Sequence, residues 1–294
     1  MDKKIDPKLI ILIGVIFVSF SSVLTKMCSA PALIIGTYRL GFTSFILLPY
    51  VLAKNTHELK NVSRKTLVQC ICSGVFLALH FATWLESIKY TSIASSTVLV
   101  NTHPIFIVLG SIFILKEKVS RKSLASIFIA LIGSAIISMG DSSLGKNILY
   151  GDMLAILGGL TVACYMLIGR IARQKLSVNA YTFIVYTSCT ITLLLFDFIT
   201  GTPLYPYPKL DWIIFISLAV CCTILGHSIF NWALEYLSPS FVSTAILGEP
   251  IFATIWAIFL FNQIPTLWQI SGGLIVIFGI YRFIQVTENS STEN

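Results

Sequence analysis

The sequence predicts an all-α integral membrane protein in which ten transmembrane helices form two inverted five-helix repeats around a central cavity. Three observations predict this fold class. The composition is very apolar, ten apolar stretches have about the length that crosses a bilayer, and an internal repeat occurs at half the length of the chain.

The composition is unlike that of a soluble domain. Of the 294 residues, 56% are hydrophobic and only 11% are charged, whereas soluble domains are about 25% charged. So much apolar surface indicates a lipid bilayer as the main surrounding. The net charge of +7 could indicate nucleic-acid binding, but the positions of the charges favour a membrane topology instead. We therefore expect no nucleic-acid partner. The seven cysteines contain no C-x-x-C pair, so we expect no disulfide framework, metal site or other cofactor.

Each apolar stretch has about 20 residues, which at about 1.5 Å per residue spans the hydrocarbon core. The first stretch follows lysines and precedes small residues, as in a cleaved signal peptide. An equivalent helix near Gly151 in the second half favours a retained helix instead. The ten stretches are residues 9–25, 32–53, 66–88, 92–115, 123–140, 151–170, 179–200, 210–234, 239–261 and 268–284.

Residues 90–133 recur without a gap at residues 236–279, an offset of 146. Because Ile and Phe match easily in an apolar chain, the matches of Pro, Gly, Ser and Tyr carry the argument. We expect residues 1–146 and 147–294 to form the first and second five-helix units. The nine identical pairs are Tyr90/Tyr236, Ser92/Ser238, Pro104/Pro250, Ile105/Ile251, Phe106/Phe252, Ile112/Ile258, Phe113/Phe259, Ile129/Ile275 and Gly133/Gly279.

The basic residues predict the topology. With the amino terminus inside, 15 Lys and Arg residues lie on the inner side and four on the outer side. Arg39 is counted on neither side, because it lies within the second predicted helix, residues 32–53. The positive-inside rule then places both termini in the cytoplasm, as expected for a multi-pass protein of the cell (inner) membrane. Because five helices per unit is an odd number, the two units enter the membrane in opposite orientation. This plan is typical of secondary transporters with a solute site near the midplane.

The repeated pattern consists of small residues, a mid-helix proline, an apolar run that ends near an acidic residue, and a glycine-containing helix. The first copy reads Ser92-Ile-Ala-Ser-Ser-Thr, Pro104-Ile-Phe, Leu115-Lys-Glu117 and Gly133; the second reads Ser238-Pro-Ser-Phe-Val-Ser-Thr, Glu249-Pro-Ile-Phe, Phe261-Asn-Gln263 and Gly272-Gly273…Gly279.

This pattern, together with Tyr38-Arg39 in helix 2, resembles the EamA-domain carriers of the drug/metabolite transporter superfamily. The resemblance covers nearly the whole chain. It implies ten helices, a central cavity and transport of amino acids, related metabolites or drugs, and it does not name the solute. Gln263 departs from the glutamate that is usual in the family, which weakens a role for a carboxylate in the second copy.

Polar groups inside a membrane bundle are costly, so those in the predicted helices are candidates for solute binding. Arg39 could bind a carboxylate with two hydrogen bonds or form a structural pair. His103 and Glu249 precede the equivalent prolines, and Glu249 could take up and release a proton. The pairs His80/Trp84 and His227/Asn231 have the i, i+4 spacing of one helix face, as do Thr97 and Asn101. The candidate substrate-binding residues are Arg39, His80, Trp84, Thr97, Asn101, His103, His227, Asn231 and Glu249.

The favoured function is a secondary active transporter that moves an amino acid or related small metabolite by alternating access. A carrier of a nucleoside-like or drug-like cation is the alternative, and protons are a possible coupling ion. A membrane-embedded enzyme is disfavoured because the chain has neither G-x-S-x-G nor H-E-x-x-H. The lack of G-x-x-x-x-G-K-[ST] argues against an ATPase, and no ring of like charges indicates a channel.

Overall fold

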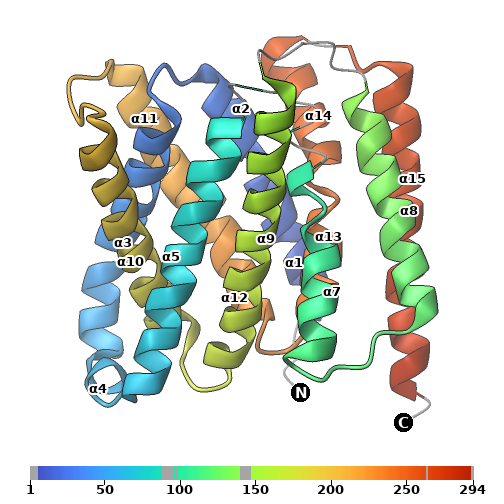
Figure 1. The fold of residues 1–294 in the computed structure, drawn as a ribbon, viewed down its shortest axis with the longest axis horizontal. Helices are drawn as coiled ribbons and strands as arrows, with labels where there is room; N and C mark the ends of the chain where they lie inside the picture. Colours follow the sequence, from blue (N-terminus) through green and yellow to red (C-terminus); the bar gives the residue numbers. More distant parts are fainter. Residues whose placement is uncertain are drawn as a thin grey trace.

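The computed structural model describes residues 6–87, 90, 96, 99–139, 147–262 and 264–292. In this part the chain forms helices that run roughly side by side, without a strand (Figure 1). The first half contains α1 (Pro7–Val18), α2 (Phe20–Met27), α3 (Ala32–Lys54), α4 (Thr56–Lys60), α5 (Arg64–Ser87), α7 (His103–Phe113) and α8 (Arg121–Ser138). The second half contains α9 (Ile148–Arg173), α10 (Val178–Thr200), α11 (Lys209–Ser217), η1 (Leu218–His227), α12 (Ser228–Ala233), α13 (Pro239–Ile246), α14 (Glu249–Phe261) and α15 (Leu267–Thr292).

The structure confirms the all-helical fold that the sequence predicts, and the length and apolar composition of its helices fit a membrane protein. Eight helical stretches in the described residues are long and apolar enough to cross a bilayer. The shorter apolar helix α7 and the 18-residue helix α8 lie between them in the sequence. Ten crossings and an inverted repeat stay predictions.

Serine side chains cap the amino-terminal ends of several of these helices. The hydroxyl of Ser120 accepts the N–H of Ser123 at 3.0 Å, and Ser177 and Ser238 cap α10 and α13 in the same way. Such caps satisfy backbone donors that have no partner inside the helix. Helix α10 ends at Gly201, whose φ of 66° is a conformation that glycine adopts without strain. Local polar residues therefore set where the apolar stretches begin and end.

Two predicted spans are broken within their length. Ser19 separates α1 from α2 in the first, and residues 247 and 248 separate α13 from α14 in the ninth. In the fourth, α7 begins only at His103. Because Pro104 and Pro250 stand in the first turn of α7 and α14, where a helix needs no N–H, each proline permits a new helix to start there.

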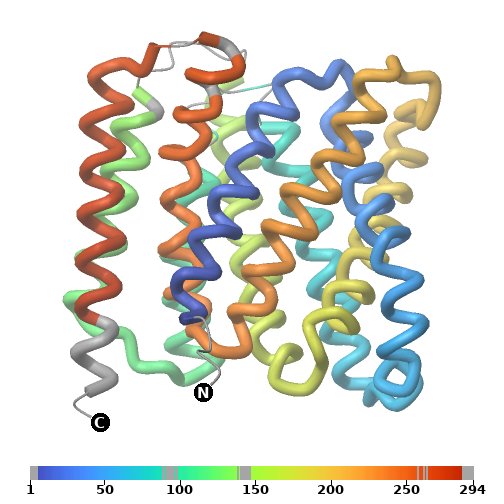
Figure 2. The backbone as a smooth tube through the Cα atoms, turned by 180° about the vertical axis from the view of Figure 1, so that it is seen from behind, coloured from blue at the N-terminus to red at the C-terminus, as the bar shows by residue number. Residues whose placement is uncertain are grey.

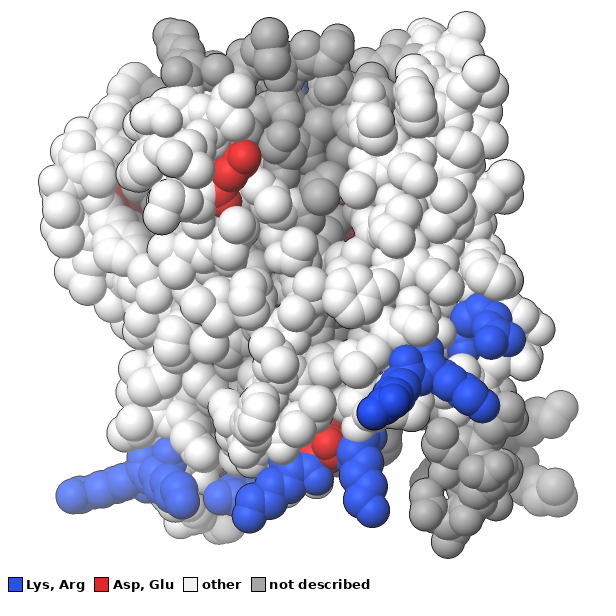
Figure 3. Space-filling view, turned by 45° about the vertical axis from the view of Figure 1, so that its right-hand side comes forward, with Lys and Arg blue, Asp and Glu red and all other residues white. Residues whose placement is uncertain are grey.

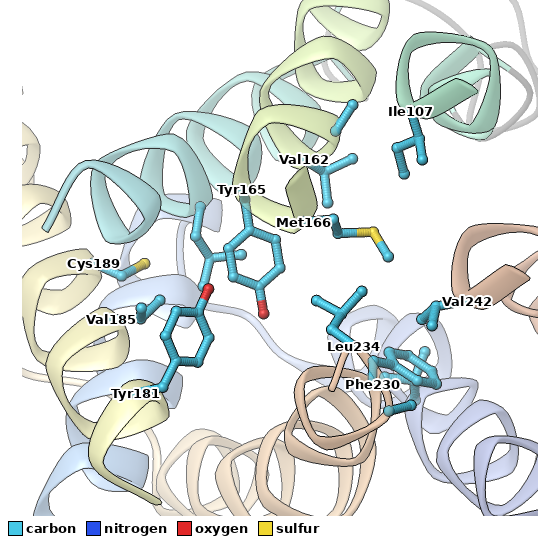
Figure 4. Close-up of a cluster of buried hydrophobic side chains, with 14 of the residues drawn as sticks. Ile107, Val162, Tyr165, Met166, Tyr181, Val185, Cys189, Phe230, Leu234 and Val242 are labelled. Carbon is cyan, nitrogen blue, oxygen red and sulfur yellow. The ribbon is translucent and has the colours of Figure 1, made fainter. Parts of the chain in front are cut away.

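The main apolar core joins both halves of the chain. Val162 and Met166 of α9 face Ile107 of α7 on one side, and Phe230 and Leu234 approach from the end of the α12 region (Figure 4). Packing inside membrane bundles is as dense as in soluble cores. It therefore holds the polar side chains between the helices in defined places.

Helices α8 and α15 run antiparallel and pack against each other (Figures 1 and 2). A Cβ atom at Gly133 would lie 2.6 Å from the backbone nitrogen of Val276, and one at Gly279 would lie 2.6 Å from that of Ala130. Glycine thus lets the two backbones approach closely, as small residues do between membrane helices. The offset of 146 exchanges these two contacts, because it relates Gly133 to Gly279 and Ala130 to Val276.

Other features recur at the same offset. The first residues of α7 and α14, His103 and Glu249, are equivalent positions. Lys116 (φ 57°) and Asn262 (φ 52°) are also equivalent, and they are the non-glycine residues with positive φ in the described part. The chain therefore turns in the same unusual way after both helices.

Basic side chains gather at one end of the molecule. On the face drawn in Figure 3, Lys and Arg lie near the lower end, and both termini lie at that end in Figure 1. This separation of charge has the form that the sequence predicts.

We predict that Gly272→Ala weakens the packing of α8 on α15. A Cβ at Gly272 would lie 2.6 Å from the backbone of both Gly133 and Ile137, and neither backbone can yield easily. Overpacking of this kind costs about 1–3 kcal/mol. The melting temperature in detergent should therefore fall. Gly273→Ala is the matched control, because its Cβ would meet Ile251 at an ordinary 3.9 Å. Equal melting temperatures for the two variants would contradict the prediction.

Candidate functional site

Arg39 is the most deeply buried of the predicted charged residues, with 4% of its surface exposed. Its Nε donates to the hydroxyl of Thr223 at 2.8 Å, and its Nη1 donates to the hydroxyl of Ser21 at 2.9 Å. The guanidinium carbon lies 5.1 Å from the centroid of the Phe81 ring. The third nitrogen, Nη2, is buried without a hydrogen-bond partner. Three elements, α2, η1 and α5, thus position the cation and leave one donor unused.

Aromatic and imidazole rings gather beside this cation. The rings of His80 and Trp84 stack with centroids 5.8 Å apart and planes 10° apart, so the predicted shared face is present. The Phe81 ring lies 5.2 Å from His80 and 6.3 Å from His227. Phe81 is therefore surrounded by Arg39 and two histidines. The sequence alone did not single out this phenylalanine.

A small cleft, with a cavity volume of about 10 Å³, lies between α2, α3 and α5. The lining residues of α5 lie in its carboxy-terminal half and those of α3 in its amino-terminal half, toward the end of the bundle opposite the termini (Figure 1). Two of the predicted residues, Arg39 and Trp84, line it. The full lining is Ser21, Thr25, Ile35, Gly36, Arg39, Phe81, Trp84 and Leu85.

Glu249 is the acidic candidate near this cation. It is half-buried as the first residue of α14, and it interacts electrostatically with Arg39. Its carboxylate forms no hydrogen bond with a described residue. Its place at a helix start suits an acidic group, because the first turn presents unpaired N–H groups and the positive end of the helix dipole.

The other predicted residues lie in different surroundings. His103 is buried, and its Nδ1 contacts the carbonyl of Val100 at 3.2 Å. Asn101 contacts Ser134 at 3.5 Å, a long hydrogen bond. Thr97 lies outside the described residues. His103 and Asn101 do not line the cleft, and the role of all three residues in binding stays a prediction.

Asn231 belongs to a buried network of its own. It is fully buried, its Oδ1 accepts from the Tyr165 hydroxyl at 2.7 Å, and its Nδ2 donates to the Tyr186 hydroxyl at 3.1 Å. The Tyr186 hydroxyl lies 3.2 Å from that of Ser228. This network ties α9, α10 and α12 together, and Asn231 could meet a solute only if the network opened.

The π-helix η1 explains the register of the second His pair. In η1 the hydroxyl of Thr223 donates to the carbonyl of Leu218, and that of Ser228 donates to the carbonyl of Thr223, each five residues back. A π-helix uses more residues per turn than an α-helix and often marks a functional site. His227 accordingly lies one position beyond the residue equivalent to His80. The sequence carries no signal that predicts η1 or the hydrogen bond that Arg39 donates to Thr223.

At the end that carries both termini, two arginines of α9 make hydrogen bonds and ion pairs with residues of α12 and of the connections that follow α7 and α12. Arg170 donates to the carbonyl of Glu235 at 3.1 Å, and Arg173 pairs with the carboxylate of Glu235 while its Nε donates to the carbonyl of Asn231 at 2.9 Å. Arg170 also lies 3.8 Å from Glu117, in the connection after α7. Burial raises the pKa of Glu117, and Arg170 opposes this rise.

The family model of the EamA-like transporters matches residues 8–139 and, a second time, residues 149–284. The chain belongs to the EamA-like transporter family. The resemblance seen in the sequence is therefore confirmed, and the chain is a multi-pass membrane transporter.

Relatives of known sequence agree with this assignment. An uncharacterized transporter of Archaeoglobus fulgidus is 26% identical over 71% of this chain and 72% of its own length. The uncharacterized transporter YxxF of Bacillus subtilis is 25% identical over 78% of this chain and 73% of its own. The pseudopaline exporter CntI of Pseudomonas aeruginosa is 23% identical over 74% of each chain. The family and these names indicate a transporter.

A solved crystal structure shares the fold. It covers 96% of this chain and 98% of its own, with a TM-score of 0.80 and 13% sequence identity. At that identity the likeness concerns the arrangement of helices and not the solute.

We predict that Asn231→Leu lowers the melting temperature in detergent markedly. The change leaves the Tyr165 hydroxyl unpaired and leaves Tyr186 with only its contact to Ser228, and an unpaired buried group costs about 1–3 kcal/mol. Asn101→Leu is the matched control and should cost much less, because that amide has only the long contact with Ser134. A smaller loss at Asn231 than at Asn101 would contradict the prediction.

Proposed function

We propose that the protein is a secondary carrier that moves an amino acid or a related small metabolite across the cell membrane. The observation that carries the proposal is Arg39, a buried cation with an unused donor on the wall of a cleft, with Glu249 within its electrostatic reach. Arg39 offers hydrogen bonds to a carboxylate, and Glu249 offers a negative charge to an ammonium group. Groups of opposite charge that interact inside the bundle would suit a solute that carries both charges.

The proposed transport cycle is alternating access between two inverted repeats, residues 1–146 and 147–294, with ten crossings. Three observations support it. The family model matches the chain twice, α7 and α14 begin at equivalent residues, and the antiparallel packing of α8 on α15 is exchanged by the repeat offset. Inverted repeats of this kind allow two related conformations that expose one site to opposite sides.

The two ends of the molecule differ as one state of such a cycle requires. The cleft of Arg39 lies toward the end opposite the termini, whereas the pairs of Arg170 and Arg173 with Glu117 and Glu235 tie the other end. In the alternative state these ion pairs would separate. The solute is bound by side chains and needs no cofactor in this proposal.

We also propose that both termini are cytoplasmic and that the protein lies in the inner membrane. The support is the gathering of Lys and Arg at the end that carries the termini (Figure 3). Basic loops remain on the cytoplasmic side during insertion.

A second candidate is a carrier of a planar cation of nucleoside or drug type. The stacked rings of His80 and Trp84, together with Glu249, favour it, because aromatic faces bind cations and flat rings. The two candidates differ in whether the solute must carry an anionic group. The relative that is named as an exporter makes export the direction to measure first.

We predict that purified protein in proteoliposomes exchanges one or more labelled amino acids, and that Arg39→Lys lowers this flux about tenfold or more. Lysine keeps the charge but cannot donate to Thr223, Ser21 and a solute from one rigid plane. A panel of amino acids, nucleosides and organic cations is the measurement. Arg282→Lys, at an exposed position of α15, is the matched control and should leave flux unchanged. Transport of organic cations alone, unaffected by Arg39→Lys, would favour the second candidate.

We predict that Glu249 couples transport to protons. A carboxyl group at a helix break inside the bundle can lose a proton when it binds an ammonium group and regain it after release. Glu249→Gln imitates the protonated form, so flux should persist but lose its dependence on the pH gradient. Glu249→Asp keeps a titratable group and should retain that dependence. The measurement is flux against external pH. A wild-type pH profile in Glu249→Gln would show that coupling lies elsewhere.

A further inference from the structure

Two donors on the wall of the cleft are buried and unpaired. They are Nη2 of Arg39 and Nε1 of the Trp84 indole. None of the other unpaired buried side-chain atoms among the described residues belongs to a residue that lines this cleft. Buried donors are nearly always satisfied, and leaving one unpaired costs about 1–3 kcal/mol. Two such donors at one cleft are available to an acceptor on a ligand.

The indole of Trp84 is held in a fixed orientation. Its ring lies nearly parallel to that of His80, and Nδ1 of His80 contacts the carbonyl of Gly158 at 3.0 Å. Helix α9 passes so close at Gly158 that a Cβ there would lie 3.3 Å from the Cβ of Trp84. The indole N–H is therefore preorganised, which lowers the entropic cost of binding a ligand through it.

Arg39 is fixed in the same manner. Thr223 and Ser21 hold two of its nitrogens, and the Phe81 ring lies beside the guanidinium, so Nη2 can change direction little. A carboxylate has two oxygens and accepts from two donors at once. A cation would leave both the indole N–H and Nη2 unpaired.

We propose that Trp84 determines specificity by donating its indole N–H, together with Nη2 of Arg39, to one carboxylate group of the solute. The inference rests on the proposed function in that it places the solute in this cleft. It adds that the anionic group is required for recognition and that the tryptophan acts as a donor, in addition to packing as an aromatic wall.

The first test is ¹⁹F NMR of protein labelled with 5-fluorotryptophan, whose five resonances report the five tryptophans. The resonance that is lost in Trp84→Phe identifies Trp84. We expect propionate and alanine to shift this resonance and ethylamine to leave it unchanged, because only the first two carry a carboxylate. A shift with ethylamine and none with propionate, or no shift with either carboxylate, would overturn the inference.

The second test is equilibrium dialysis of labelled propionate against purified protein. Trp84→Phe keeps a ring that can stack on His80 but lacks the donor, so propionate should bind about tenfold more weakly. Trp212→Phe is the matched control, because Trp212 packs in a separate cluster with Tyr38 and Phe215. Equal affinity in Trp84→Phe and wild type would overturn the inference.

The two proposals fail in different ways. If no amino acid is transported but propionate still shifts the Trp84 resonance, the proposed solute is wrong and the carboxylate site stands. If amino-acid flux depends on Arg39 while carboxylates do not shift the Trp84 resonance, the proposed function stands and the role of Trp84 is overturned.

Discussion

The buried guanidinium of Arg39 is the constraint around which the site is organised. Inside a bundle in lipid there is no bulk water to satisfy its donors, so the protein must supply partners. Ser21 of α2 and Thr223 of η1 supply two, and Phe81 of α5 covers the group. Three other elements are thus tied to one side chain of α3. Nη2 of Arg39 remains without a partner and is available to an acceptor on a ligand.

Helix breaks supply the second ingredient of the site. Prolines one residue after His103 and Glu249 allow helices to begin within the bundle, and the same offset relates both breaks. The equivalent positions carry different chemistry, since one is an imidazole bonded to the carbonyl of Val100 and the other is a carboxylate without a described hydrogen bond. The repeat therefore provides similar geometry in both halves, while the equivalent positions carry different ionisable groups.

Close backbone packing gives this arrangement its rigidity. At Gly133 and Gly279 the helices α8 and α15 approach until no Cβ fits. At Gly158 the approach of α9 to α5 is less close, and a Cβ there would lie 3.3 Å from that of Trp84. Close contacts of this kind hold the helices at defined distances. In the proposed transport cycle we expect the glycine contacts to persist. We expect movement at segments that are held by side-chain bonds, such as η1 and the arginine pairs at the end near the termini.

The sequence by itself determined the membrane class, the helical content, the family and the repeat, because apolar length, charge placement and proline and glycine positions are local properties. It also predicted that Arg39 and Trp84 face a site and that His80 and Trp84 share a helix face, since spacing along one helix is sufficient for that. Only the tertiary structure decided the partners across helices. It placed Ser21, Thr223 and Phe81 on Arg39, assigned Asn231 to a network with Tyr165 and Tyr186, and introduced the π-helix that shifts His227. These contacts join residues far apart in the chain, and their geometry depends on how whole helices pack, which no pattern within one helix contains.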